Sequence, residues 1–81
     1  MNTKEKVFSL MSELSGLETI NENNRLKTDL AFDSLMLVTM LIKIEDVFEI
    51  RLNESDMNPF ALLNVSDVIK LIEKYLSQTD A

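Results

Sequence analysis

The sequence predicts an all-α fold, a bundle of three main helices and one short helix. The 81 residues contain one glycine and one proline, so signals for strands and tight turns are sparse. Apolar residues instead recur three or four positions apart in three separate stretches, which is the spacing of amphipathic helices. A chain of this length can bury one modest core, and we therefore expect residues 1–81 to form a single domain.

The first helix is expected over about residues 2–15. Its apolar face consists of Val7, Leu10, Met11 and Leu14. Asn2 followed by Glu5 is similar to a capping box, and Gly16 stands where a left-handed C-terminal stop is expected. Both ends of this helix are therefore marked in the sequence.

A polar, asparagine-rich stretch follows and predicts a long loop. Loops of this length in small domains usually have a function or are disordered. Four apolar residues in the stretch are spaced to touch a core, namely Leu17, Ile20, Leu26 and Leu30. We therefore expect an ordered crossover.

The second helix is expected over about residues 34–49, with Asp33 or Ser34 as its N-cap. The expected core stripe consists of Leu35, Val38, Leu41 or Ile42, and Phe48. Apolar residues also lie outside this stripe, at Met36, Leu37 and Met40. Such a helix is either buried on two sides or exposes a docking surface.

Two further helices are expected in the last third of the chain. Asn58-Pro59 places proline where it opens a brief helix, over about residues 58–63. The last helix is expected over about residues 65–77, because Asn64 followed three residues later by Asp67 is a cap signature. Its apolar face consists of Val65, Val68, Ile69, Ile72 and Leu76.

The charge balance limits the partners. Fourteen acidic against eight basic residues give a net charge of −6, which argues against nucleic acid or an anionic membrane as partner and favours a protein with a basic patch. No N-terminal signal and no apolar run of about 20 residues is present, so we expect a cytoplasmic protein.

The chain contains neither cysteine nor histidine. The usual general base for a serine nucleophile and the commonest transition-metal ligands are therefore missing, and we expect no enzymatic activity and no metal site. The acidic and amide residues of 21–24 do not form a calcium loop, because no glycine or closing glutamate follows at the required positions.

Ser34 is the candidate functional residue. A serine at a helix N-terminus, at the end of a long loop, is exposed, and the positive end of the helix dipole favours a phosphate there. The alternative is that Ser34 serves as an ordinary N-cap.

The residues around Ser34 resemble the signature of acyl carrier proteins. Leu30 is followed by a short turn, by Asp33-Ser34-Leu35, and by an amphipathic helix that ends in acidic residues and Phe48. Chain length, acidity, the long loop and the Asn64-Val65 start of the last helix match the family too. The resemblance implies an acyl-carrier-like four-helix bundle in which a separate phosphopantetheinyl transferase attaches 4'-phosphopantetheine to Ser34.

The resemblance also implies roles for other residues. Asp33 is expected to help the transferase bind its metal or orient the serine, and Leu35 to border the arm. Partner-binding residues are expected at Met36, Leu37, Met40, Glu45, Asp46 and Glu49. The core between the second and last helices either stays closed or parts to shelter an acyl chain among Val38, Ile42, Leu52, Leu62 and Ile69.

Apolar residues occupy positions on the second helix where a fatty-acid-synthesis carrier commonly has acids. We therefore expect a specialised, monomeric carrier of fatty acid, polyketide or related biosynthesis, served by a dedicated acyl-loading ligase or synthase. Two alternatives remain open. One is an aminoacyl or D-alanyl carrier, and the other is an unmodified helical interaction domain in which Ser34 is a cap.

Overall fold

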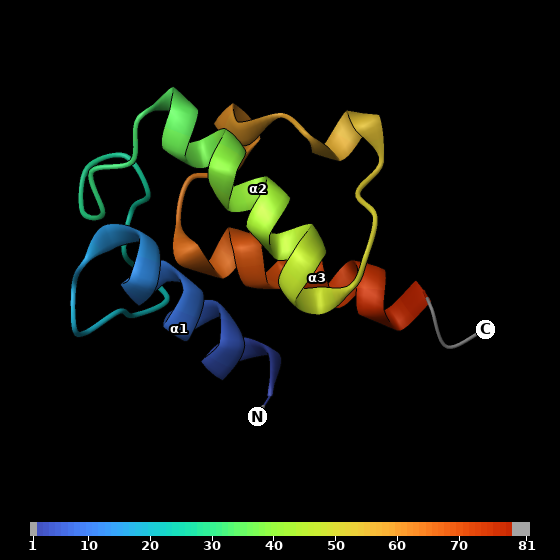
Figure 1. Cartoon of the computed structure of the whole chain (residues 1–81), viewed down its shortest axis with the longest axis horizontal. Helices are drawn as coiled ribbons and strands as arrows, with labels where there is room; N and C mark the ends of the chain where they lie inside the picture. The colour runs from blue at the N-terminus through green and yellow to red at the C-terminus, as the bar shows by residue number, and fades with distance from the viewer. Residues whose placement is uncertain (1, 79–81) are drawn as a thin grey trace.

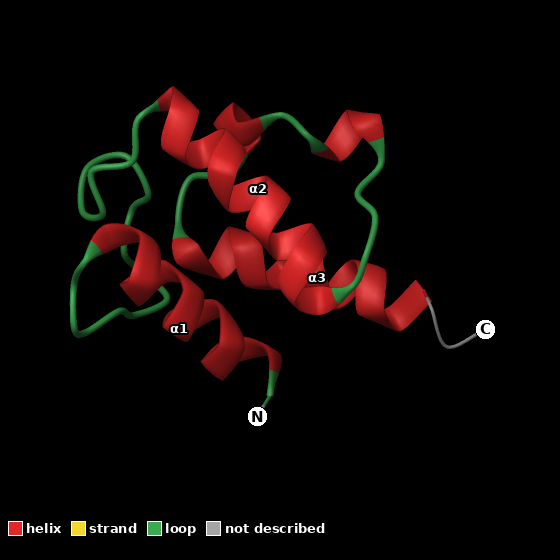
Figure 2. Ribbon diagram, in the orientation of Figure 1, coloured by secondary structure: helices red, strands yellow, loops and turns green. Residues whose placement is uncertain are grey.

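In the computed structural model, which describes residues 2–78, three α-helices enclose one apolar core (Figure 1, Figure 2). The helices are α1 (Thr3–Ser15), α2 (Ser34–Phe48) and α3 (Val65–Gln78). α1 packs alongside α3, and α2 crosses in front of α3 in the view of Figure 1. The described residues contain no β-strand beyond one isolated bridge, so the all-α prediction is confirmed.

The connection between α2 and α3 differs from the expected single helix over residues 58–63. It contains two 3-10 turns, η1 (Glu54–Asp56) and η2 (Pro59–Ala61). The Asn58 side chain accepts a hydrogen bond from the Phe60 N–H at 3.0 Å, and the Asn58 carbonyl accepts one from the Ala61 N–H at 3.1 Å. An asparagine that binds its neighbours' backbone in this way favours a tight turn over an extended helix.

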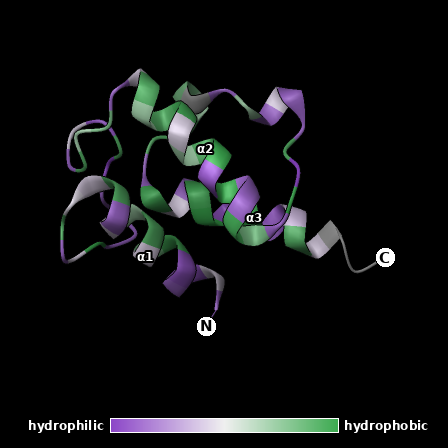
Figure 3. Cartoon of the chain, viewed as in Figure 1, coloured by the Kyte–Doolittle hydropathy of each residue, from purple (hydrophilic) through white to green (hydrophobic). Residues whose placement is uncertain are grey.

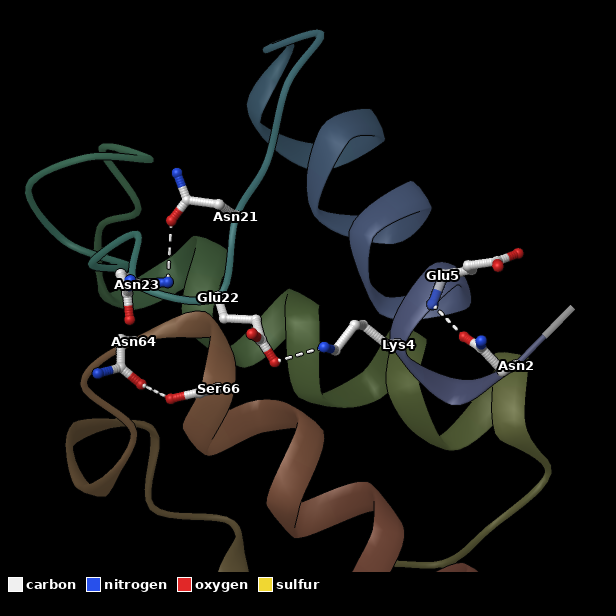
Figure 4. Close-up of polar contacts among 8 residues, drawn as sticks. All are labelled: Asn2, Lys4, Glu5, Asn21, Glu22, Asn23, Asn64 and Ser66. Atoms are coloured by element: carbon white, nitrogen blue, oxygen red, sulfur yellow. Dashed lines mark hydrogen bonds and ion pairs between the residues drawn. The ribbon is translucent and has the colours of Figure 1, made fainter.

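α1 has the two ends that its sequence predicts. The Asn2 Oδ1 accepts a hydrogen bond from the Glu5 N–H at 2.8 Å (Figure 4). Gly16 has a φ of 79° and donates its N–H to the Ser12 carbonyl at 2.9 Å. Glycine enters this left-handed region without the steric penalty of a Cβ.

Backbone hydrogen bonds hold the long loop against the beginning of α3. The Val65 N–H donates to the Asn24 carbonyl and the Ser66 N–H to the Glu22 carbonyl, both at 3.0 Å. The Glu22 carboxylate also pairs with the Lys4 ammonium of α1 at 2.8 Å (Figure 4). The loop therefore satisfies donors that the first turn of α3 cannot satisfy itself.

Apolar side chains from the loop enter the core as well. Ile20, Leu26 and Leu30 are buried, as expected. Leu17 was expected to join them and does not, since 43% of it is exposed. It follows Gly16 directly, and the left-handed turn there carries the chain away from the core side of α1.

α2 packs on a different face from the expected one. Its buried residues are Leu37, Met40, Leu41 and Ile44. The expected stripe residues Leu35, Val38 and Ile42 are exposed. Both sets follow helical spacing, but the observed set is complete at positions i, i+3, i+4 and i+7, whereas Thr39 interrupts the other.

Candidate functional site

Ser34 is the first residue of α2 but not its N-cap. The cap is Asp33, whose Oδ1 accepts a hydrogen bond from the Met36 N–H at 2.8 Å. Ser34 is exposed, and its hydroxyl forms no hydrogen bond with any residue in the described range 2–78. The interpretation of Ser34 as an ordinary cap is therefore wrong, and its hydroxyl is free to react.

The start of α2 also provides unused backbone donors. The N–H groups of Ser34 and Leu35 donate no hydrogen bond within the described part of the chain. Leu35 is itself 77% exposed, so nothing encloses this end of the helix. A phosphodiester on the Ser34 Oγ would lie at the positive end of the helix dipole and beside these donors, and the residues present therefore fit a phosphopantetheine arm.

A tight turn fixes the approach to Ser34. Ala31 adopts a left-handed conformation with a φ of 57°, which costs a residue with a Cβ about 1–2 kcal/mol. Phe32 follows it, is buried, and donates its N–H to the Leu26 carbonyl at 2.9 Å. Burial of this ring offsets the backbone strain and anchors the chain two residues before Ser34.

The structure corrects part of the expected partner surface. Leu37 and Met40 are fully buried and therefore cannot contact a partner. Met36 is half-buried, and Leu35 lies exposed beside Ser34. In Figure 3 the hydrophobic colouring of α2 extends over several of its turns, because the core stripe and an exposed apolar stripe share this helix.

The expected acidic contacts on α2 divide into two kinds. Asp46 and Glu49 are exposed. Glu45 is half-buried, and its Oε2 accepts a hydrogen bond from the Leu52 N–H at 2.9 Å. This contact secures the chain as it leaves α2, so Glu45 has a structural role that the sequence did not reveal.

The five residues expected to shelter an acyl chain are not brought together. Val38 and Ile42 lie on the exposed side of α2, whereas Leu52 and Ile69 belong to the closed core. Leu62 is half-buried and lines a surface cavity. Val38 and Ile42 therefore do not share an interior pocket with the other three residues, because they face outward.

Two residues that line this cavity contact each other, and no sequence pattern predicts that contact. The Lys27 ammonium of the long loop lies 4.6 Å from the centroid of the Phe60 ring in η2. Phe60 is 55% exposed, which is unusual for a large aromatic residue. The two positions are far apart in the sequence, and no periodic pattern connects them.

Neither a metal-binding cluster nor a membrane-spanning helix occurs among the described residues. Among residues 2–78, no group of three or more carboxylate side chains is placed to hold a metal ion. No helix in the same range has the length and apolar character needed to cross a membrane.

Comparisons with known proteins agree with this geometry. Residues 5–72 match the family model described as "Phosphopantetheine attachment site". The acyl carrier protein of Thermotoga maritima is 33% identical over 73 residues, covering 88% of each chain, and that of Phytoplasma mali is 31% identical over 67 residues, covering 76% of this chain and 77% of its relative.

The fold is similar to a solved carrier structure as well. The crystal structure of an acyl carrier protein from Thermotoga maritima superimposes with a TM-score of 0.76 at 28% identity, covering 95% of this chain and 94% of that one. Members of the matched family are carriers rather than catalysts, and their prosthetic group is 4'-phosphopantetheine. The chain therefore belongs to the acyl carrier protein family.

Proposed function

We propose that Ser34 is the residue that carries the 4'-phosphopantetheine arm. The observation that supports this most directly is the exposed, unpartnered Ser34 hydroxyl at a helix start whose cap is supplied by Asp33. In the attachment step the Ser34 Oγ bonds to the phosphorus of the phosphopantetheine half of coenzyme A. The diphosphate bond breaks, adenosine 3',5'-bisphosphate leaves, and the hydroxyl proton is released to the transferase or to solvent.

The thiol at the end of the arm holds acyl groups as thioesters. The chain itself supplies a rigid base for the arm, since Phe32 and Leu37 are buried on either side of Ser34. We assign to Asp33 a second task beyond capping, that of presenting a carboxylate to the transferase and its metal. The chain needs no base of its own because the transferase supplies catalysis.

The test is incubation of the purified chain with coenzyme A and a broad-specificity phosphopantetheinyl transferase, followed by intact mass measurement. We expect one phosphopantetheine mass increment on the wild type and none on Ser34→Ala. Ser55→Ala is the matched control, because Ser55 is also exposed, and it should be modified like the wild type. An increment that persists in Ser34→Ala would overturn the assignment.

We further propose that partner enzymes dock on the outer side of α2. The exposed residues Leu35, Val38 and Ile42 form an apolar stripe that begins beside Ser34, and Asp46 lies at the acidic far end. A partner that fits this surface has an apolar contact near the serine and a basic patch farther along. This pattern supports a specialised carrier rather than a general fatty-acid carrier.

Ile42→Gln should lower the kcat/KM of the transferase reaction at least several-fold, because the transferase must itself dock beside Ser34. Glu73→Gln on α3 is a control, since Glu73 is exposed away from this stripe and its loss should leave the rate unchanged. A cytoplasmic location and a monomeric state stay predictions. Size-exclusion chromatography with light scattering tests the second of them.

A further inference from the structure

A surface cavity lies between the long loop and the segment that contains η2. Its volume is about 180 Å³. A hydrogen bond of 3.1 Å from the Leu26 N–H to the Leu63 carbonyl joins its two walls, and η2 contacts α2, which begins at Ser34 (Figure 1). We call it the loop–η2 cavity, and its lining residues are Arg25, Lys27, Thr28, Phe60, Leu62 and Leu63.

Two cationic side chains line the loop–η2 cavity, although the chain carries a net charge of −6. Arg25 and Lys27 line it, no carboxylate does, and neither cation forms an ion pair within residues 2–78. Two carboxylates outside the lining are held by backbone groups: Asp29 accepts a hydrogen bond from the Arg25 N–H at 2.8 Å, and Asp67 accepts one from the Leu63 N–H at 2.9 Å. By contrast, two larger cavities beside α1 both include Glu13 in their lining.

The same cavity has an apolar wall. The Phe60 ring and Leu63 are 55% and 68% exposed. The Lys27 ammonium lies over the Phe60 ring at 4.6 Å, a contact that leaves its N–H donors available to an anion. An apolar wall with two cations matches a ligand that combines a short hydrocarbon segment with a terminal negative charge.

We propose that the loop–η2 cavity binds the free carboxylate end of a short acyl group carried on the arm, that is, of a dicarboxylic acid held as a half-thioester. This inference rests on the proposed attachment at Ser34. A cavity of roughly 150 Å³ holds a benzene-sized molecule, so about 180 Å³ suits a short acyl group.

The phosphate of the arm is the other anion available. Its ester bond would fix it at Ser34, which is not among the residues that line the cavity. The arm is long and flexible, so its far end is the part that can reach the two cations. The terminal carboxylate is therefore the anion that the cavity favours.

The test compares two cargoes of matched shape. The transferase loads Ser34 from either succinyl-coenzyme A or 4-methylpentanoyl-coenzyme A, which differ by a carboxylate in place of an isopropyl group. Amide shifts in nitrogen-15 NMR spectra report contact, and a carbon-13 label on the succinyl carboxylate reports its pKa. The variants are Lys27→Gln and Arg25→Gln, and Lys43→Gln is the control, an exposed cation on α2 outside the cavity.

Succinyl loading should shift the amides of Thr28, Phe60 and Leu63 relative to the holo form, and 4-methylpentanoyl loading should not. The succinyl carboxylate should have a pKa about 0.5 unit below that of free succinyl-pantetheine, because nearby cations favour its charged form. Lys27→Gln and Arg25→Gln should each reduce both effects, Lys43→Gln should not, and added salt should weaken them.

Two results would overturn the inference. One is an equal set of shifts for both cargoes, which would mean that the carboxylate is not recognised. The other is a set of shifts at Leu52 and Ile69 instead, which would place the cargo in the core. Both require successful loading, so they are distinct from a failure of the proposed function, in which no mass is gained on Ser34 at all.

Discussion

The Tyr75 hydroxyl of α3 donates a hydrogen bond to the Asp56 carboxylate of η1. The same hydroxyl accepts a hydrogen bond from the Asn53 N–H at 2.8 Å, and Lys74 pairs with Asp56 at 3.1 Å. One buried tyrosine thus holds both ends of the η1 turn against the last helix.

Tyr75→Phe should lower the Tm by about 4 to 8 °C, because it removes a hydrogen bond and leaves the Asn53 N–H without its acceptor. Differential scanning calorimetry measures the change. Lys74→Gln is the comparison, since that ion pair is half-exposed at the lysine and should contribute little. An equal decrease in Tm for Tyr75→Phe and Lys74→Gln would show that the Tyr75 hydroxyl is not the main contact between η1 and α3.

The Asp56 contact should also make stability depend on pH. The hydrogen bond from Tyr75 and then that from Lys74 hold the pKa of Asp56 below its ordinary value. A lowered pKa contributes stability above about pH 4, and this contribution is lost as the pH falls through the folded-state pKa. The stability difference between wild type and Asp56→Asn should therefore shrink between about pH 5 and about pH 3 in urea unfolding.

Tyr75 gives the opposite dependence at the alkaline end. Burial, and then the hydrogen bond to Asp56, raise the pKa of the Tyr75 hydroxyl. The contribution of the protonated Tyr75 hydroxyl to the free energy of unfolding is fully present below about pH 10, and it is lost as the pH rises through the raised pKa. In Tyr75→Phe this alkaline loss should be absent, and its persistence would assign the loss to other groups.

Two isoleucines on α2 test which face packs inward. Ile44 is fully buried and Ile42 is 56% exposed. Ile44→Val should lower the free energy of unfolding by about 0.5–1.5 kcal/mol, whereas Ile42→Val should change it by less than about 0.5 kcal/mol. Urea unfolding with an unchanged m-value measures both. A larger loss of stability for Ile42→Val than for Ile44→Val would support the core stripe expected from the sequence instead.

Asp33 should have two separable roles. Asp33→Ala removes the cap on the Met36 N–H and should cost about 1 kcal/mol of stability. Asp33→Asn keeps a capping oxygen and removes the charge, so it should stay within a few tenths of a kcal/mol of the wild type and still slow phosphopantetheine transfer. Wild-type transfer by Asp33→Asn would limit Asp33 to capping.

Two left-handed residues should respond in opposite directions. Gly16 has open space where a Cβ would lie, so Gly16→Ala causes no steric clash with other residues. The variant gains left-handed backbone strain but loses less conformational entropy on folding, so the free energy of unfolding should fall by about 0.5–1 kcal/mol. Ala31→Gly should stabilise by a similar amount, because Ala31 is exposed and loses no packing. Thermal unfolding of the double variant should show the two effects cancelling.

The sequence was most informative where a local pattern is compatible with a single structure. The cap at Asn2 and the stop at Gly16 are local, and the structure confirms both. Most of the buried face of α3 was also predictable, since Val65, Val68, Ile69 and Ile72 are buried as expected. Leu76 is only partly buried, and the buried Tyr75 was not predicted. The acyl carrier signature around Ser34 added the fold and the prosthetic group, which composition alone could not provide.

The sequence was least informative where two sets of apolar residues on one helix both follow helical spacing. On α2 the positions of Leu37 and Leu35 both begin a largely apolar stripe. Thr39 interrupts the second stripe, and packing shows that the first is buried. Contacts such as that of Lys27 with Phe60 depend on how distant segments meet, which periodicity does not report. The contact of Tyr75 with Asp56 of η1 was missed for the same reason, because it joins residues 19 positions apart in the sequence.

The pairing of the long loop with the start of α3 has a consequence for the order of events during synthesis. The carbonyl groups of Asn24 and Glu22 find their donors at Val65 and Ser66, which leave the ribosome much later. Until α3 has formed, the segment leading to Ser34 lacks these anchors, and α2 lacks the part of the core that α3 supplies. Phosphopantetheine transfer should therefore be inefficient until α3 has formed, because Ser34 is not yet held in its folded setting.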